Sequence, residues 1–350
     1  MDWKEKMNRI VPASEKRLIA AWQRLDSLAK PRRSLGLLEE IAARYSAIRE
    51  DEPPSVAGKG VFVFAADHGV VNEGVSAYPQ EVTGLMVKNF LAGGAGINVL
   101  ARCAAAEVFV VDVGMARDPG AAPGLIRRAV RHGTGNILRE PAMSMEELEA
   151  ALNVGIEMSE SAFEKGINVV GTGDMGIGNT TAASAVFASL LPAEPARVTG
   201  RGTGLDDRGL QHKIRVIEQA VARAAVPGEE PLRTLAELGG LEIAAICGLC
   251  LGAASRRIAV MVDGFISSAG ALAAMRLKPE AADYLFFSHC SVESGHRVFF
   301  EIEGIRPLMD LDLRLGEGTG AALAMQILES GVKVYNEMAT FAEVGIEPGA

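Results

Sequence analysis

Short apolar runs alternate with long helical segments through most of this chain, and the alternation constrains the fold more than any other feature. The runs are rich in β-branched and aromatic residues, and the segments between them have helical periodicity. The runs occupy residues 61–65, 108–113, 167–170, 258–262 and 284–287, and the helical segments occupy 80–102, 144–165, 206–223 and 232–251. Strands separated by helices pair in parallel, so the pattern predicts an α/β fold with helices on both faces of a parallel sheet.

Both ends of the chain are predicted to be helical. Residues 14–28 and 34–50 have the periodicity of two amphipathic helices. Residues 51–60, rich in acidic residues, Pro and Gly, are typical of a domain boundary. Residues 318–347 are again largely helical, and we expect them to fold back onto the N-terminal helices.

Composition narrows the class of protein. The net charge of −9 and a pI near 5.3 argue against a nucleic-acid or anionic-membrane surface, which leaves small-molecule chemistry. The N-terminus lacks the pattern of a signal peptide, so we expect a cytoplasmic protein. The apolar stretch 241–275 is interrupted by Arg256, Arg257 and Asp263, which favours buried helix and strand over a membrane span. Cys247 and Cys250 lie in that stretch and are predicted to be small core residues.

A glycine-rich stretch, residues 171–181, is predicted to be a turn between a strand and a helix. Unpaired amides at the start of a helix form a site for an anion. Gly171, Gly173 and Gly176 also fit the dinucleotide spacing G-x-G-x-x-G, so an NAD-dependent oxidoreductase is an alternative. The acidic residue that binds ribose in such proteins does not follow, which counts against that alternative. A tight turn without a ligand is the other alternative.

Two further stretches carry candidate chemistry. Residues 200–209, also rich in glycine, precede a helix that contains Lys213, and the helix start and the ammonium group together suit a monophosphate. Glu317 lies between two glycines before another apolar helix. It could complement the helix dipole, or act as a general base if burial raises its pKa. The histidines and cysteines show no metal-ligand spacing, so we expect no metal.

Six motifs in this order resemble one enzyme family over nearly the whole chain. They are ADHGV (66–70), EGVSAYPQEVT (73–83), GDMGIGNTT (173–181), GRGTGLDD (200–207), SHCSVESGH (288–296) and LRLGEGTGAA (313–322). The chain resembles the nicotinate-nucleotide:dimethylbenzimidazole phosphoribosyltransferases, pentosyltransferases of cobalamin biosynthesis.

The resemblance implies a reaction and an architecture. Nicotinate mononucleotide gives its 5-phosphoribosyl group to 5,6-dimethylbenzimidazole, and the products are α-ribazole 5'-phosphate and nicotinate. The resemblance also implies a cytoplasmic homodimer with no cofactor, a Rossmann-like sheet, and small-molecule substrates only. Residues 1–58 and 318–350 would form a small helical domain, and residues 59–317 a large α/β domain that binds the substrates and carries the catalysis.

The resemblance also implies roles for individual residues. Glu317 would be the base that takes the proton from the benzimidazole, with Asp174 as a second catalytic acid. The residues implied to bind the substrates are Gly176, Gly202, Thr203, Gly204, Lys213 and Ser291 at the donor phosphate, and Ser76, Tyr78, Leu85 and Leu315 elsewhere at the site.

This chain departs from the family pattern at two of these positions. Asp174 stands where family members usually have glutamate, and Leu85 stands where they often have glutamine. These changes leave open a purine or a phenolic compound as the acceptor, and also a nucleotide-binding protein that has lost catalysis.

Overall fold

The structure, a computed structural model, is built on a six-stranded parallel sheet and describes residues 2–226, 228 and 230–346. The strands lie in the order β3-β2-β1-β4-β5-β6. They are β1 (Lys59–Ala66), β2 (Glu107–Gly114), β3 (Leu125–Arg127), β4 (Val169–Met175), β5 (Ala259–Val262) and β6 (Leu285–Phe287). This is the strand order of a doubly wound Rossmann-like sheet, so the predicted fold class is confirmed. Five strands match the predicted runs, and the short edge strand β3 was not predicted.

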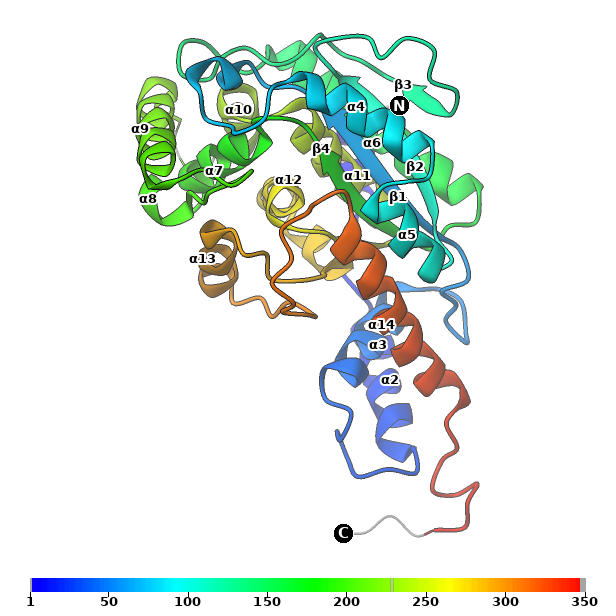
Figure 1. Ribbon diagram of the computed structural model, residues 1–350. Coiled ribbons are helices and arrows are strands. Elements are labelled where there is room, and N and C mark those ends of the chain that lie inside the picture. Colours follow the sequence, from blue (N-terminus) through cyan, green and yellow to red (C-terminus); the bar gives the residue numbers. More distant parts are fainter. Residues whose placement is uncertain (1, 227, 229, 347–350) are drawn as a thin grey trace.

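Helices cover both faces of the sheet (Figure 1). One face carries α4 (Glu81–Leu91), α5 (Gly96–Cys103) and the first turns of α14 (Thr319–Glu337). The other carries α11 (Leu241–Ser255) and α12 (Phe265–Leu277), with α6 (Met145–Glu164), α7 (Asn179–Leu190) and α10 (Pro231–Leu238) packed outside them. The remaining helices of the large body are α8 (Pro195–Val198), α9 (Asp207–Ala224), α13 (Ser294–Glu303) and the 3-10 turns η1 (Gly69–Glu73) and η2 (Pro279–Tyr284).

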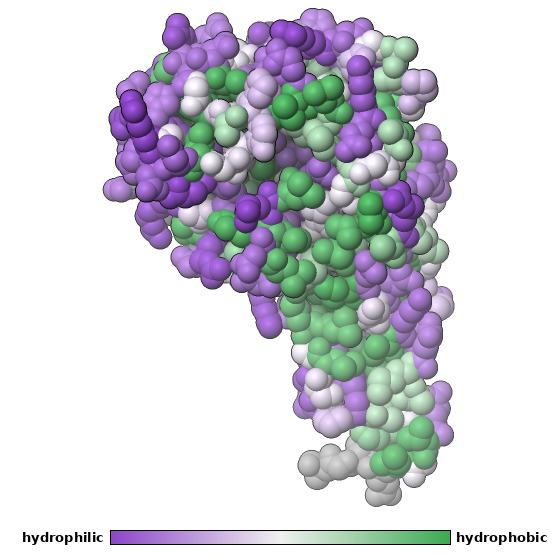
Figure 2. All heavy atoms as spheres, viewed as in Figure 1, coloured by the Kyte–Doolittle hydropathy of each residue, from purple (hydrophilic) through white to green (hydrophobic). Residues whose placement is uncertain are grey.

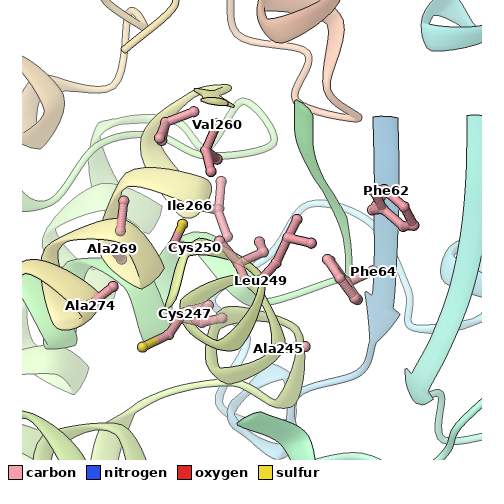
Figure 3. Packing of buried hydrophobic residues seen from close by; sticks show 14 of the residues in the cluster. Phe62, Phe64, Ala245, Cys247, Leu249, Cys250, Val260, Ile266, Ala269 and Ala274 are labelled. Atoms are coloured by element: carbon pink, nitrogen blue, oxygen red, sulfur yellow. The ribbon is translucent and has the colours of Figure 1, made fainter. Parts of the chain in front are cut away.

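Part of the core lies between β1 and α11, where Phe64 of the strand faces the side of the helix that carries Ala245 and Leu249 (Figure 3). Helix α11 also approaches α6 closely, because a Cβ added at Gly248 would meet the Leu152 carbonyl oxygen at 2.0 Å. Cys247 and Cys250 are fully buried in this core as free thiols, as predicted. Substituting Gly248 with any larger residue would therefore force the two helices apart.

Glycine pairs divide two segments that were predicted as single helices. Residues 80–102 form α4 and α5, with a break that contains Gly93 in the left-handed region at φ +79°. Residues 232–251 form α10 and α11, separated by Gly239 and Gly240. Each glycine costs about 1 kcal/mol inside a helix relative to alanine, so a pair of them favours an end there.

The glycine-rich stretch from residue 171 differs from its predicted turn. Strand β4 runs on to Met175, so the turn is confined to residues 176–178. Gly171 and Gly173 have ordinary strand backbone and allow close packing, since a Cβ at Gly173 would meet the Glu317 carbonyl oxygen at 2.6 Å. Two of the three glycines in the dinucleotide spacing therefore lie inside a strand, and the phosphate turn of that fingerprint is not formed.

A helical arm projects from the large body (Figure 1). It contains α2 (Glu15–Ser27), α3 (Leu37–Ile48) and the last turns of α14, which share a small apolar cluster around Leu25 and Tyr335. Helix α1 (Trp3–Asn8) instead packs on α6 and α11, where Lys6 Nζ lies 2.7 Å from a Glu160 carboxylate oxygen. The division into domains at residues 58 and 318 stays a prediction, and its last four residues, 347–350, lie outside the described part.

One stretch, Glu81–Cys103, is long and apolar enough to cross a membrane by length and composition alone. In the fold it comprises α4 and α5, which are separated by residues 92–95 and pack on β1 and β2. Its most apolar 18-residue window is 33 % buried, and the contacts with β1 and β2 make the two helices part of one layer of the α/β body.

Candidate active site

The candidate site lies beyond the carboxyl ends of β1, β4, β5 and β6. The strand order reverses between β1 and β4, and ligands of doubly wound sheets bind at such a switch point. A cavity at this edge is lined by residues 174–177, 179, 180, 202, 203, 264–266, 289, 291, 293 and 314–316. Predicted site residues among them are Asp174, Gly176, Gly202, Thr203, Ser291 and Leu315, which come from four separate segments of the chain.

Three carboxyl groups gather at this edge. Asp174 and Glu317 are each 5 % exposed, and Asp263 is 1 % exposed. Burial, with the nearby carboxylates of Asp263, Glu242 and Glu317, raises the pKa of Asp174 well above its ordinary value. Burial likewise raises the pKa of Asp263 to about 7, although backbone amides at the start of α14 oppose the shift. A site with this many buried acids holds protons near neutral pH and can exchange them with a ligand.

The backbone at Glu317 adopts a conformation that is unusual for a residue with a side chain. Its φ is +65°, in the left-handed region, between Gly316 at +76° and Gly318 at +93°. Such a conformation costs about 1 kcal/mol or more and is found most often at functional sites. Packing keeps it in place, because Gly173 and Gly318 bring β4 and the start of α14 into direct backbone contact.

The carboxyl group of Glu317 is held by α5. Its Oε2 accepts a hydrogen bond from the Ile97 amide at 3.2 Å, and its Oε1 accepts none from the residues that the structure describes. Burial raises the pKa of Glu317, and the Ile97 amide partly opposes the shift. Gly96 leaves room for this arrangement, since a Cβ there would lie 3.4 Å from Oε2 and 2.8 Å from Leu315 Cδ2. One oxygen is thus fixed, and the other is available to a proton donor.

Lys213 lies directly behind the cavity wall. It is fully buried, and its Nζ donates to Thr180 Oγ1 at 2.7 Å. Burial lowers its pKa to about 8, and the carboxylate of Glu293 opposes the shift. A Cβ at Gly202 would meet Nζ at 3.0 Å, so this glycine lets the ammonium group approach the cavity. A buried cation beside hydroxyl and amide groups has the composition of a phosphate site.

The predicted loop residues come from two loops beside the cavity. Thr203 Oγ1 accepts from the Ala77 amide at 2.9 Å and lies 3.3 Å from Ser76 Oγ, so the two loops touch. Gly204 lies exposed in the same turn as Thr203, at φ +104°, outside the cavity wall. Tyr78 is 54 % exposed and is not part of the cavity lining. The structure therefore brings Ser76 and Thr203 together and leaves Gly204 and Tyr78 outside the lining.

Leu85 lies in a second cavity, away from Asp174. Its side chain is 63 % exposed. The lining of this cavity is Asp67, Gln80, Glu81, Gly84, Leu85, Lys88 and residues 116–119. Thr83 lies between the two cavities, because its Oγ1 donates to Asp67 Oδ1 at 2.7 Å and accepts from the Ile177 amide at 3.2 Å. Of the ten predicted substrate-binding residues, Leu85 is therefore the one placed in a different cavity.

Several site residues had no predicted role. Asp263 Oδ1 and Oδ2 accept from the amides of Ala321 and Gly318 at 3.0 and 3.1 Å, so this side chain fixes the start of α14 beside Glu317. His289 lines the cavity, and burial lowers its pKa to about 4, so it is neutral. Asp263 directly follows the predicted strand 258–262, and His289 is the second residue after the predicted strand 284–287, which is the signal that could have identified them. Asn179, Thr180, Glu293 and Arg314 lie within or beside the quoted motifs.

The described part of the chain, 2–226, 228 and 230–346, holds no group of three or more His, Cys, Asp or Glu side chains arranged to bind a metal ion. What the cavity does offer is the buried carboxyl group of Asp174 in its wall and the buried ammonium group of Lys213 directly behind its wall. This arrangement can bind an anionic group and accept a proton a short distance away.

Comparison with known proteins identifies the family. A family model described as phosphoribosyltransferase matches residues 10–346. A nicotinate-nucleotide:dimethylbenzimidazole phosphoribosyltransferase of Geobacter sp. is 54 % identical over 97 % of both chains, and that of Geobacter metallireducens is 54 % identical over 99 % of this chain and 98 % of its own. The crystal structure of CobT from Thermus thermophilus, 48 % identical, superimposes with a TM-score of 0.92 over 95 % of this chain and 100 % of its own. The chain belongs to the nicotinate-nucleotide:dimethylbenzimidazole phosphoribosyltransferase family.

Proposed function

We propose that this protein transfers the 5-phosphoribosyl group of nicotinate mononucleotide to 5,6-dimethylbenzimidazole, giving α-ribazole 5'-phosphate and nicotinate. The observation that carries the proposal is the cavity at this edge of the sheet, which is lined by Asp174, Gly202 and Gly316, with Lys213 directly behind Gly202 and Glu317 next to Gly316. Lys213 suits the phosphate of the donor, and Glu317 suits removal of the acceptor's proton.

The donor phosphate would bind where the loops after β4 and before α9 meet. Gly176 lies at the turn, and a Cβ there would meet the Ala66 carbonyl oxygen at 2.0 Å, so only glycine fits. Thr180, Gly202 and Lys213 supply the hydroxyl, the amide and the positive charge. Ser291 lines the same cavity, with its amide donating to His296 Nδ1 at 2.9 Å.

Transfer forms one bond and breaks another at the anomeric carbon of ribose. One nitrogen of the benzimidazole attacks, the bond to the pyridinium nitrogen breaks, and nicotinate leaves with the electron pair of that bond and a neutral ring nitrogen. The proton on the second benzimidazole nitrogen passes to Glu317 Oε1. Because the leaving group gains no negative charge at its ring nitrogen, the protein has to stabilise charge chiefly at the acceptor.

Asp174 would take part as a neutral acid. Its Oδ2 accepts from Asn179 Nδ2 at 3.0 Å, and its Oδ1 is buried without a partner among the described residues. Burial and the neighbouring carboxylates favour the protonated form, which can donate a hydrogen bond to a ligand oxygen.

Asp174→Asn should therefore keep most of the activity, within about threefold of the parent chain, because an amide resembles a protonated carboxyl group in size and in donor capacity. Steady-state rates with nicotinate mononucleotide and dimethylbenzimidazole test this. A loss of about 10²-fold or more, as expected when a group that must be ionised is neutralised, would show that Asp174 acts as a carboxylate.

The pH dependence of kcat/KM should be bell-shaped. Glu317 must be ionised to accept a proton, so the rate rises as pH passes its raised pKa. Lys213 must be protonated to attract phosphate, so the rate falls as pH passes its pKa of about 8. A pH profile of each single variant tests the assignment, since Glu317→Gln should lose the acidic limb and Lys213→Met the basic limb. A basic limb that persists without Lys213 would belong to another group.

The physiological acceptor is proposed to be dimethylbenzimidazole, and the structure offers one reason to test others. Leu85, which stands where relatives often have glutamine, puts a methyl-rich surface at the second cavity. That cavity adjoins the main one through Thr83. A purine or a phenolic acceptor would place different polar groups there, so the choice of base depends on this wall.

We also propose that the protein works as a homodimer in the cytoplasm. Hydrophobic residues gather over the helical arm and the adjoining surface of the body, a face that suits a second copy (Figure 2). All four cysteines are free thiols, as is usual in a reducing compartment. Sedimentation of the purified protein would test the dimer.

Nicotinate release measured by chromatography tests the function directly. Incubation with nicotinate mononucleotide and a panel of benzimidazoles, purines and phenols should release nicotinate fastest with dimethylbenzimidazole. Release with none of the bases would contradict the enzymatic proposal. Binding of the mononucleotide without turnover would instead favour a protein that has lost catalysis.

A further inference from the structure

Glu293 is a buried acid in the wall of the cavity that has no part in the chemistry proposed above. It immediately precedes α13 and lines the cavity with Gly202 and Thr203. Its Oε2 is buried and has no hydrogen-bond partner among the described residues. A Cβ at Gly200 would lie only 1.8 Å from this oxygen, so glycine at that position makes the space for the carboxyl group.

The groups that face Glu293 are those that would hold the donor phosphate. Burial raises the pKa of Glu293, and Lys213, the Gly202 amide and Arg314 oppose this shift by favouring the carboxylate. Burial lowers the pKa of Lys213, and Glu293 in turn opposes that shift. A carboxylate and a phosphate are both anions that accept hydrogen bonds, so they compete for the same ammonium and amide groups.

We propose that Glu293 is a specificity-determining residue of the phosphate site, whose carboxylate competes with a bound phosphate for Lys213 and Gly202 and thereby excludes inorganic phosphate. The inference rests on the proposed function, since it assumes that a phosphate monoester binds in this cavity. It adds a negative charge beside Gly202 and Lys213, which favour an anion.

The competition discriminates between ligands by the number of contacts that they make. A phosphate group that enters must displace the Glu293 carboxylate or lie beside it, and either event costs binding energy. Nicotinate mononucleotide offsets this cost with contacts to its ribose and pyridine rings. Inorganic phosphate makes contacts only through its own oxygens, so its affinity is reduced by the full cost of displacing or approaching the Glu293 carboxylate.

The test is the affinity of the purified protein for inorganic phosphate, measured by calorimetry near pH 7, where Lys213 is protonated. Glu293→Gln keeps the size of the side chain and removes its charge, and it should bind phosphate at least about tenfold more tightly than the parent chain. Inhibition by phosphate against nicotinate mononucleotide should strengthen by the same factor. Glu301→Gln, an exposed glutamate on α13, is the matched control and should change neither quantity.

An unchanged or weaker affinity of Glu293→Gln for phosphate would overturn the inference. A weaker affinity would mean that Glu293 serves only to keep Lys213 charged. Glu293→Ala gives a second measurement if the amide variant does not fold, with the same expected direction. Turnover of the parent chain is measured separately. If Glu293→Gln binds phosphate more tightly but the parent chain shows no turnover, the proposed function is contradicted and this inference stands.

Discussion

Glu317→Gln should fold like the parent chain and lose about 10²- to 10⁴-fold of its turnover, the range expected when a general base is removed. The glutamine carbonyl can still accept the hydrogen bond from the Ile97 amide that now goes to Oε2. Glutamine also meets the same steric demand at φ +65°, so the backbone gains no new strain. What it loses is the ability to take a proton from the acceptor.

The variant also separates a chemical role from a structural one. Benzimidazoles whose ring N–H is more acidic need less help from a base, so their rates should fall less in Glu317→Gln than the rate with dimethylbenzimidazole. Glu337→Gln, an exposed glutamate at the end of α14, is the control and should keep full activity. An equal loss for all acceptors, together with a lowered melting temperature, would indicate that Glu317 acts by shaping the site.

The environment of Glu317 explains why a carboxylate can serve as a base there. An exposed glutamate is too weak a base near neutral pH, and burial raises its pKa toward the useful range. Asp174 and Asp263 would oppose ionisation of Glu317 if both were charged, but burial raises the pKa of each of them as well.

The layered fold could be predicted from the sequence because hydrophobic periodicity is local. The β-branched runs marked five of the six strands, and the edge strand β3, with three residues, was too short to stand out. The extent of β4 was not predictable in the same way. Gly171 and Gly173 look like turn residues, but the reason for them is tertiary, because Met325 and Glu317 pack against them from α14 and the loop before it.

Motifs in the sequence supplied the candidate site residues, whereas residues that long-range contacts bring to the candidate site had no local signal. Glu317 stood out between two glycines, whereas its left-handed backbone follows from packing on β4. Asp263 is 55 residues away from the Gly318 amide that it binds, so no local pattern links them. The resemblance to the family pattern singled out Leu85, but only the fold places it in the second cavity.

Lys213→Met should lower kcat/KM for nicotinate mononucleotide by about 100-fold, because it removes the buried charge that faces the donor phosphate. This change corresponds to ~2.7 kcal/mol, at about 1.36 kcal/mol for each tenfold change in rate. The main effect should be on KM, since the phosphate lies away from the reacting carbon. Arg215→Met removes one positive charge from the exposed face of α9 and should leave KM unchanged. An equal rise of KM in both variants would mean that general electrostatic attraction, and not Lys213, accounts for the effect.

The same variant should be more stable than the parent chain, which distinguishes loss of a functional charge from loss of structure. Burial lowers the pKa of Lys213 from about 10.4 in the unfolded chain to about 8. A lysine with a lowered pKa in the folded state destabilises the fold fully below pH 8, and the penalty disappears as pH rises toward 10. Methionine has no charge to bury, so the free energy of unfolding near pH 7 should rise by about 1–3 kcal/mol. The gain is reduced because the Thr180 hydroxyl loses the hydrogen bond that Lys213 donates to it. Denaturant unfolding at pH 7 and at pH 10 measures this, with a gain expected at pH 7 that shrinks at pH 10. If Lys213→Met is less stable than the parent chain at both pH values, Lys213 stabilises the fold. The buried charge would then not be a functional feature that lowers stability.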